Sequence, residues 1–356
     1  MTPAFRLPVH TRQLAVAAYA VLAAAIGFDL STGPHWTISP VLAAAPVLAG
    51  VGTRRARIPL AVGAVALVLV VVLGVHDRAV ALLDQVASGF AVLATTCISA
   101  ANVVLVATRE RELVHSRSVA EAAQLALLRP VPERIGGLRV AVRYLAAAAD
   151  ARVGGDLYEV LETPCGARLI IGDVRGKGLP AVETAADVLG TFREAAQVEA
   201  GLGDVARRLD AAVRRRGGGE EFVTAALLHI GEPDAPAEMV NCGHPPPLCK
   251  QGGTVTRIEA RTADGDPPLA LRELDERPYH TERFTFERGD LLVLYTDGVT
   301  EARDAEGRFY PLESRLARMP ENSPDALADR LVADLLAHAG GTLSDDAALL
   351  VVRRQH

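Results

Sequence analysis

Charged residues are scarce over the first hundred positions and become frequent after Arg109, so the chain divides into an apolar and a polar part. The apolar part contains four segments, at about 13–30, 36–52, 58–75 and 86–107. Apolar helices of this length match the roughly 30 Å hydrocarbon core of a bilayer. Pro40 and Pro46 interrupt the second segment, although neighbouring helices can satisfy the backbone groups that a proline frees. We therefore expect an all-α, four-helix transmembrane domain over residues 1–108.

Arginines in the loops between these segments predict the topology. They lie before the first segment, between the second and third, and after the fourth: Arg6, Arg12, Arg54, Arg55, Arg57, Arg109, Arg111 and Arg117. The other two loops carry only Arg78. The positive-inside rule then gives a multi-pass protein of the inner (plasma) membrane with both termini in the cytoplasm. A cleaved signal peptide is the alternative for the first segment, but three more apolar segments follow and no clear cleavage site is seen.

The clearest apolar segments carry no ionisable residue near their middle. Transporters and proton pumps usually have one there. The pattern therefore favours an anchor or a sensor over a conduit.

Residues 109–136 form the expected helical linker. Residues 110–129 are rich in Ala, Glu, Leu and Arg, which are strong helix formers. Pro130 and Pro132 predict that this helix ends near Arg129. Its apolar stripe is too short to indicate a coiled coil, so a plain surface helix and a dimerising signalling helix both stay open, and with them a homodimer.

The remaining part, residues 137–354, shows strand and helix patterns in mixed order. Strands are expected at about 138–144, 168–174, 222–230, 290–295 and 347–352. Helices are expected at about 180–198, 202–215 and 324–338. This order lacks the regular alternation of a doubly wound fold and predicts packed sheets with helices outside, an α+β domain.

Composition excludes some functions. The formal net charge is -6, so no global basic field indicates a nucleic-acid partner. The four cysteines, Cys97, Cys165, Cys242 and Cys249, fit no zinc-site or redox spacing. Cys242 lies beside Gly243 and His244, but nothing in the sequence indicates an activated thiol.

Aspartates at the ends of apolar runs carry the candidate chemistry. They are Asp156, Asp173, Asp297 and the pair Asp345 and Asp346. Carboxylates gathered in this way suit hard divalent cations, which prefer oxygen ligands. Strand ends hold a side chain rigidly enough for such a site, and two ions held together can activate water for attack on a phosphoryl group. Each motif alone is equally typical of a turn.

Taken in order, the motifs resemble those of a known family. They are Gly-Gly-Asp156-Leu-Tyr, Gly-Asp173-Val-Arg-Gly-Lys-Gly-Leu-Pro-Ala, Phe222-Val-Thr-Ala-Ala, Asn241-Cys-Gly-His244-Pro, Tyr-Thr-Asp297-Gly-Val-Thr-Glu301 and Asp345-Asp346-Ala. This set resembles the SpoIIE-type branch of the metal-dependent protein phosphatase 2C (PPM) family, over about residues 120–353. The resemblance implies an αββα sandwich, two Mn²⁺ or Mg²⁺ ions, and hydrolysis of phosphoserine or phosphothreonine by water that the ions activate.

The resemblance also implies a role for each acid. Asp173 is similar to the acid that bridges both ions, and the backbone carbonyl of Val174 joins it. Asp156 resembles the acid that contacts the metal cluster partly through water. Asp297 and Asp345 resemble the ligands of the second ion. Asp346 takes the place of a neighbouring acid or amide and is included with the metal-binding residues.

Some residues depart from the family pattern. Arg175 and Lys177 stand where many relatives have Ser and His, Cys242 stands where Ala is usual, and Glu159 replaces a commoner Asp. None of these is an expected ligand, and the four main acids remain. His244 lies in a rigid turn and is interpreted as a structural or supporting group more readily than as a general acid.

The expected function is that of a membrane-anchored serine/threonine phosphatase. In bacteria the resemblance implies a phosphorylated anti-sigma-factor antagonist as the partner and substrate. The alternative is a catalytically weak membrane sensor or scaffold that uses the same fold for partner switching. A histidine kinase is not indicated, because the sequence shows no Asn- and Gly-box ATP site.

Overall fold

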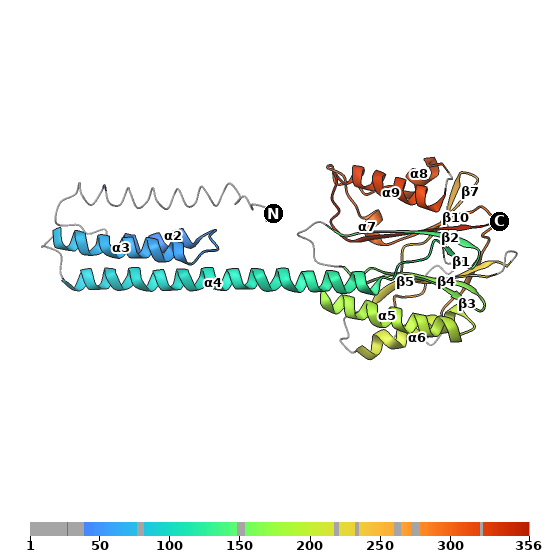
Figure 1. The fold of residues 1–356 in the computed structure, drawn as a ribbon, viewed down its shortest axis with the longest axis horizontal. Helices are drawn as coiled ribbons and strands as arrows, with labels where there is room; N and C mark the ends of the chain where they lie inside the picture. Colours follow the sequence, from blue (N-terminus) through green and yellow to red (C-terminus); the bar gives the residue numbers. More distant parts are fainter. Residues whose placement is uncertain are drawn as a thin grey trace. The chain divides into compact units, whose positions relative to one another are not determined.

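The computed structural model describes residues 27, 39–76, 82–147, 154–216, 221–231, 235–259, 265–271, 278–320 and 323–355. The chain forms two compact units, Met1–His115 and Ser116–His356. Two long helices dominate the described part of the first unit, and two sheets with their helices form the second (Figure 1).

The first unit contains a short 3₁₀ segment η1 (Ser39–Ala43), α2 (Ala44–Gly50), α3 (Arg57–His76) and the beginning of α4 (Leu82–Leu127). Small residues let α3 and α4 approach closely: a Cβ on Gly63 would meet the Thr96 side chain at 2.1 Å. Near the other end of this contact, Gln85 Nε2 donates to the Gly74 carbonyl at 2.9 Å. The two helices therefore pack as an antiparallel pair.

Two of the four expected membrane spans are long apolar helices in the described part of the chain. They are Arg57–Val75 and Leu82–Glu112. Within the second expected span, 36–52, the described residues form a shorter apolar helix, Val41–Gly50. Val51 is extended and Gly52 has a φ of 75°, so the helix cannot continue. The first expected span, 13–30, lies outside the described residues, apart from residue 27.

The linker helix is continuous with the last apolar segment. We expected a separate helix from 109, yet α4 runs unbroken to Leu127, close to the predicted end before Pro130. No glycine or proline occurs between Phe90 and Arg129, so nothing in the backbone chemistry interrupts the helix.

Two antiparallel sheets form the second unit. The first has the order β1-β2-β11-β10-β7-β8, with bounds Arg134–Ile135, Leu138–Leu145, Ala347–Arg354, Leu291–Tyr295, Leu248–Gln251 and Thr254–Arg257. The second has the order β3-β4-β5-β6-β9, with bounds Leu157–Thr163, Gly166–Val174, Val223–Ile230, Ala237–Cys242 and Glu282–Phe284.

Helices cover the outer face of each sheet. The pair α5 (Leu179–Val198) and α6 (Leu202–Arg216) lies on the five-stranded sheet, and α8 (Leu312–Arg318) and α9 (Pro324–His338) lie on the other (Figure 1). The short α7 (Asp297–Thr300) follows β10. This arrangement is an αββα sandwich, as expected.

Alternation along the central strands explains the layers. In β10, Leu292 and Leu294 point into the core between the sheets, whereas Leu291 and Val293 face the core under α8 and α9. All five residues of β10 are buried, which is typical of a strand covered on both faces. Such strands read as continuous apolar runs and were predicted, whereas short or partly polar strands such as β8 (Thr254–Arg257) and β9 (Glu282–Phe284) were not.

Candidate active site

Strand pairing brings two of the predicted acids together at one edge of the five-stranded sheet. Asp173 is the penultimate residue of β4, and Asp156 directly precedes β3. Because Leu157 pairs with Gly172, the antiparallel register brings Asp156 opposite Asp173. Asp156 is buried and Asp173 is partly buried.

The other predicted acids lie at the end of the six-stranded sheet. Asp297 begins α7 directly after β10, and Asp345 and Asp346 directly precede β11. Since β10 and β11 are neighbours in this sheet, their adjoining loops lie side by side. A Cβ on Gly298 would come within 1.9 Å of the Asp346 carbonyl oxygen, so only glycine allows this close approach.

Thr296 joins the two groups of acids across the sandwich. Its Oγ1 donates to Asp156 Oδ2 at 2.9 Å and accepts from the backbone N–H of Ala348 at 2.9 Å. Thr296 is completely buried. The hydroxyl therefore fixes one carboxylate oxygen of Asp156 against the end of β11.

The Asp346 carboxylate accepts hydrogen bonds from two backbone amides, a role that the sequence did not predict. Its Oδ1 accepts from the Ala147 N–H at 2.7 Å and its Oδ2 from the Gly154 N–H at 2.6 Å. The residue is buried, and hydrogen bonds to a carboxylate are among the stronger ones in proteins. Asp346 thus anchors the backbone just ahead of Asp156.

Burial and mutual repulsion raise the pKa values of the clustered carboxyl groups. Burial raises the pKa of Asp156 well above its usual range, and the charge of Asp173 adds to the effect. Burial, followed by the charges of Asp297 and Asp345, raises the pKa of Asp173 to about 7. The pKa of Asp297 is also raised, first by burial and then by Glu301 and Asp345. Crowded carboxyl groups of this kind call for a compensating cation.

A lysine supplies part of that compensation. Lys177 Nζ donates to Asp345 Oδ2 at 2.7 Å. Its charge also lowers the pKa values of Asp173 and Asp297, against the effect of burial. In the sequence, Lys177 stands out only as a departure from a family pattern, and its position between two glycines was the available signal.

The residues present fit divalent cations in their chemistry. The donors are carboxylate oxygens and the Val174 carbonyl, which a Cβ on Gly155 would meet at 2.6 Å. Hard cations favour oxygen donors of these kinds, and Lys177 already brings one positive charge to the cluster. In the described part of the chain, no three His, Cys, Asp or Glu side chains converge closely enough to form a ready coordination group. The acids therefore interact through their charges, while the side-chain oxygens of Asp156, Asp345 and Asp346 accept hydrogen bonds from Thr296, Lys177 and backbone amides.

His244 is buried behind the acids as a neutral imidazole. Burial lowers its pKa to about 4. Its Nε2 lies 3.1 Å from the Tyr295 carbonyl, which can only accept, so Nε2 carries the proton and Nδ1 accepts from Thr224 Oγ1 at 3.2 Å. Both ring nitrogens are thus occupied, which supports the structural interpretation of this residue. The neighbouring Cys242 is buried.

The linker end also reaches the site. Gln124, on the last turns of α4, donates from Nε2 to the Asp156 backbone carbonyl at 3.3 Å and is itself buried. Ala120 on the same helix packs against Val182 of α5. Sequence reasoning missed this contact, because a glutamine on a helix face carries no signal for its partner.

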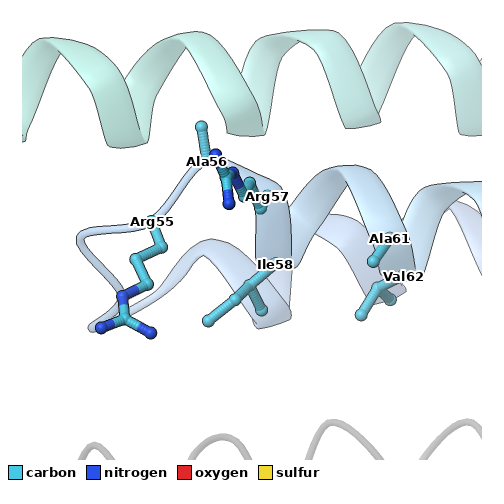
Figure 2. Close-up of a pocket in the computed structure, with 6 residues that line it drawn as sticks. All are labelled: Arg55, Ala56, Arg57, Ile58, Ala61 and Val62. Atoms are coloured by element: carbon cyan, nitrogen blue, oxygen red, sulfur yellow. The ribbon is translucent and has the colours of Figure 1, made fainter.

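Two surface hollows are candidate places for a ligand to bind. One of about 690 Å³ lies at the start of α3 and is lined by Arg55, Ala56, Arg57, Ile58, Ala61 and Val62 (Figure 2). In Figure 2, Arg55 extends outward from the turn before the helix. This lining offers no carboxylate for a metal ion. Another hollow, of about 520 Å³, is lined by residues that include Tyr295, Thr300 and Phe309, and none of the five predicted acids lines it.

Comparison with known proteins decides the family. The family described as Stage II sporulation protein E (SpoIIE) matches residues 164–355, which is more than half of the chain. The chain belongs to the SpoIIE family. The matched SpoIIE region begins just before β4 and includes Asp173, Asp297, Asp345 and Asp346, whereas Asp156 precedes it.

Two curated relatives of this SpoIIE-family chain align with its C-terminal part. The stage II sporulation protein E of Priestia megaterium is 25% identical over 213 residues, covering 59% of this chain and 35% of the relative. The phosphoserine phosphatase RsbU of Bacillus subtilis (strain 168) is 23% identical over 208 residues, covering 57% of this chain and 60% of RsbU. The chain thus spans less than two thirds of the length of either relative.

A solved structure supports the fold. The SiaA-PP2C domain of Pseudomonas aeruginosa superposes with a TM-score of 0.57 at 19% identity, covering 69% of this chain and 98% of that domain. At this identity the similarity concerns the fold. The expected PP2C-like αββα architecture of this SpoIIE-family chain is therefore confirmed for its C-terminal part.

Proposed function

We propose that this chain is a membrane-anchored, metal-dependent protein serine/threonine phosphatase. The observation that carries the proposal is that acids of the two sheets lie close enough to interact electrostatically and are bridged by Thr296. The charges of Asp297 and Asp345 act on Asp173, and Thr296 binds Asp156. Membership of the SpoIIE family supports it, and one relative is a phosphoserine phosphatase.

Two Mn²⁺ or Mg²⁺ ions are part of this proposal. Asp156, Asp173, Asp297 and Asp345 would hold them, with the Val174 carbonyl and, in an outer position, Asp346. Such ions would neutralise the acids, lower the pKa of water and draw negative charge from a phosphoryl group. The raised pKa of Asp173 supports this role, because a carboxyl group that is costly to ionise alone gains from a nearby cation.

The chain's own residues orient the site. Thr296 holds Asp156 in one rotamer, and the neutral His244 supports the backbone at Tyr295, where β10 leads into Asp297. Burial of both residues excludes water from behind the acids. The acids would thus meet a substrate from one open side.

A phosphorylated protein is the proposed substrate. The hollow lined by Tyr295, Thr300 and Phe309 offers apolar and polar side chains, and Arg303 stacks on the exposed Phe309 ring at 4.3 Å. Such a surface can accept the peptide that flanks a phosphoserine or phosphothreonine. The family resemblance indicates an anti-sigma-factor antagonist as the phosphoprotein, and a homodimer through the linker remains part of the hypothesis.

The membrane part of the proposal rests on α3 and α4. Their outward side chains are apolar and exposed, including Val68 at 61%, Val71 at 64% and Phe90 at 72%. Exposed apolar surface on this scale is costly in water and suits lipid. These helices are therefore proposed to cross the membrane.

Charged residues at the ends of α3 and α4 support the proposed orientation of these helices in the membrane. Arg54 forms an ion pair of 2.7 Å with Glu110, so the flank before α3 and the flank within α4 lie on the same side. Arginines on both flanks favour the cytoplasm. The proposed boundaries are 1–108 for the membrane domain, 109–136 for the linker and 137–354 for the phosphatase domain, with both termini cytoplasmic.

The test is phosphate release from a phosphoserine peptide by the full chain in detergent. Metal-stripped protein should be inactive and recover with Mn²⁺ or Mg²⁺. Asp297→Asn should lose about 100-fold or more, because changes even beyond the direct ligands cost 10–100-fold. Asp187→Asn, which alters a surface acid paired with Arg216, is the matched control and should retain activity. Full activity of stripped protein in chelator contradicts the proposal.

One observation favours the alternative of a catalytically weak scaffold. The described acids are engaged by Thr296, Lys177 and backbone amides instead of forming a ready coordination group. A scaffold predicts that the metal-loaded chain binds its phosphoprotein partner without releasing phosphate. The same assay, followed by measurement of partner binding, separates the two functions.

A further inference from the structure

The loop between β4 and α5 presents a lysine to the acid cluster. Lys177 lies between Gly176, with a φ of 114°, and Gly178, with a φ of 84°. A Cβ at either glycine would meet nothing within 4 Å, so packing does not require glycine there. The backbone conformation does, because side-chain-bearing residues rarely adopt such φ values. Two glycines thus shape a turn around this single cationic side chain.

The ammonium group meets a predicted metal ligand directly. Lys177 Nζ lies 2.7 Å from Asp345 Oδ2, while Asp345 Oδ1 accepts from the Asp346 N–H at 3.0 Å. Both oxygens of Asp345 therefore have partners. Lys177 contacts Oδ2, the oxygen that is not bound to the neighbouring backbone amide.

We propose that Lys177 is a resident counter-cation of the acid cluster, which a divalent ion must displace from Asp345. This inference rests on the proposed function, since it concerns the ions that the phosphatase would use. An ion that binds Asp345 Oδ2 would compete with the ammonium group for the same oxygen. The two positive charges would also repel each other at this short range.

The exposure of the pair makes the exchange feasible. The Lys177 side chain is 38% exposed and that of Asp345 is 42% exposed, and ion pairs in such positions contribute little to stability. A divalent ion interacts with several carboxylates at once, whereas the ammonium group contacts one. Lys177 therefore stabilises the metal-free cluster while weakening its apparent affinity for the ion at Asp345.

The test compares three variants of the full chain in detergent by Mn²⁺ titration, with calorimetry or the EPR signal of free Mn²⁺ as the readout. Lys177→Met removes the charge and keeps the aliphatic stem. It should bind the more weakly held Mn²⁺ about 3–10-fold more tightly than the wild type, within the range expected for one nearby charge. The unfolding temperature of its metal-free form should change little, because the ion pair is exposed. Lys177→Arg keeps the charge and should stay close to the wild type.

Arg175→Met is the matched control. Arg175 is two residues away on the same loop, but its guanidinium stacks on the Phe222 ring at 5.2 Å. Loss of this charge should leave Mn²⁺ affinity within about twofold of the wild type, because an exposed charge is screened over distance.

Unchanged or weaker Mn²⁺ binding by Lys177→Met overturns the inference, as does an equal gain in Arg175→Met. These results differ from a failure of the proposed function. That failure would appear as wild-type protein that binds no Mn²⁺ or releases no phosphate with it. The inference on Lys177 fails alone when the wild type binds Mn²⁺ and is active, yet Lys177→Met titrates in the same way.

Discussion

Thr296 Oγ1 donates to Asp156 Oδ2 at 2.9 Å, and this hydrogen bond joins the residue that follows β10 in one sheet to the acid that precedes β3 in the other. The same hydroxyl accepts from the Ala348 N–H. A single buried side chain therefore couples the packing of the sandwich to the orientation of a candidate metal ligand.

Thr296→Val tests this coupling. Valine fills the same volume but leaves both Asp156 Oδ2 and the Ala348 N–H without their partner in a buried place. We expect a loss of about 1–3 kcal/mol in the free energy of unfolding, measured by chemical denaturation. Mn²⁺ affinity should also fall, since Asp156 is no longer held.

Thr300→Val is the control for that change. Thr300 Oγ1 donates only within its own turn, to the Asp297 carbonyl at 3.3 Å. Its replacement should alter stability by less than about 1 kcal/mol. Equal losses in both variants would contradict a special role for Thr296.

Asp173→Asn should stabilise the metal-free protein at neutral to alkaline pH while abolishing its response to Mn²⁺. The pKa of Asp173 is about 7 when folded, against an ordinary value near 3.8. The folded state therefore binds more protons between these values, and stability falls as pH rises through that window. Removing the charge should raise the free energy of unfolding above pH 7 by on the order of 1–3 kcal/mol, as measured by thermal unfolding with and without Mn²⁺.

Asp329→Asn is the control, because the pKa of Asp329 is lowered in the folded protein, whereas that of Asp173 is raised. Arg143 lowers the pKa of Asp329 through a side-chain hydrogen bond of 2.7 Å. Its removal should not stabilise the protein at any pH. If Asp173→Asn behaves in the same way, the acid cluster is not repulsive as inferred.

His244 should make stability depend on pH below neutrality. Its pKa is about 4 when folded, against an ordinary value of 6.5. The unfolded state binds more protons between pH 4 and 6.5, so stability rises with pH through this window, by about 3 kcal/mol for the whole shift.

The variant His244→Gln tests this dependence. Glutamine lacks a titrating group but keeps a donor for the Tyr295 carbonyl. Its free energy of unfolding, measured at several pH values, should change less than that of the wild type between pH 4 and 6.5. Identical slopes would show that other groups cause the acid sensitivity.

A reporter fused after residue 356 tests the membrane proposal. A cytoplasmic readout is expected if α3 and α4 cross as a pair, as proposed, because arginines flank both ends of the pair. The chain should also sediment with membranes and resist extraction by salt. A periplasmic readout would contradict the topology, and release by salt alone would contradict insertion.

Buried strands and amphipathic helices could be predicted because their signal is local. The continuous apolar run of β10 and the Pro324–His338 helix were both found from the sequence. Helix α9 even carries a local start signal, with Ser323 Oγ accepting from the Ala326 N–H and Pro324 in the first turn. The short edge strand β9 was not predicted, because three residues are too few to show a periodic pattern.

Motif order and apolar periodicity are local features of the chain, so the amino-acid sequence alone was enough to predict the family, the layered α+β architecture and a set of candidate acids. It did not determine which partners those acids meet. Thr296, Lys177 and Gln124 lie 140, 168 and 32 positions from the residues that they contact. Only the closing of the two sheets onto each other brings such groups within hydrogen-bonding distance, since these contacts depend on register and packing and leave no pattern in the local sequence.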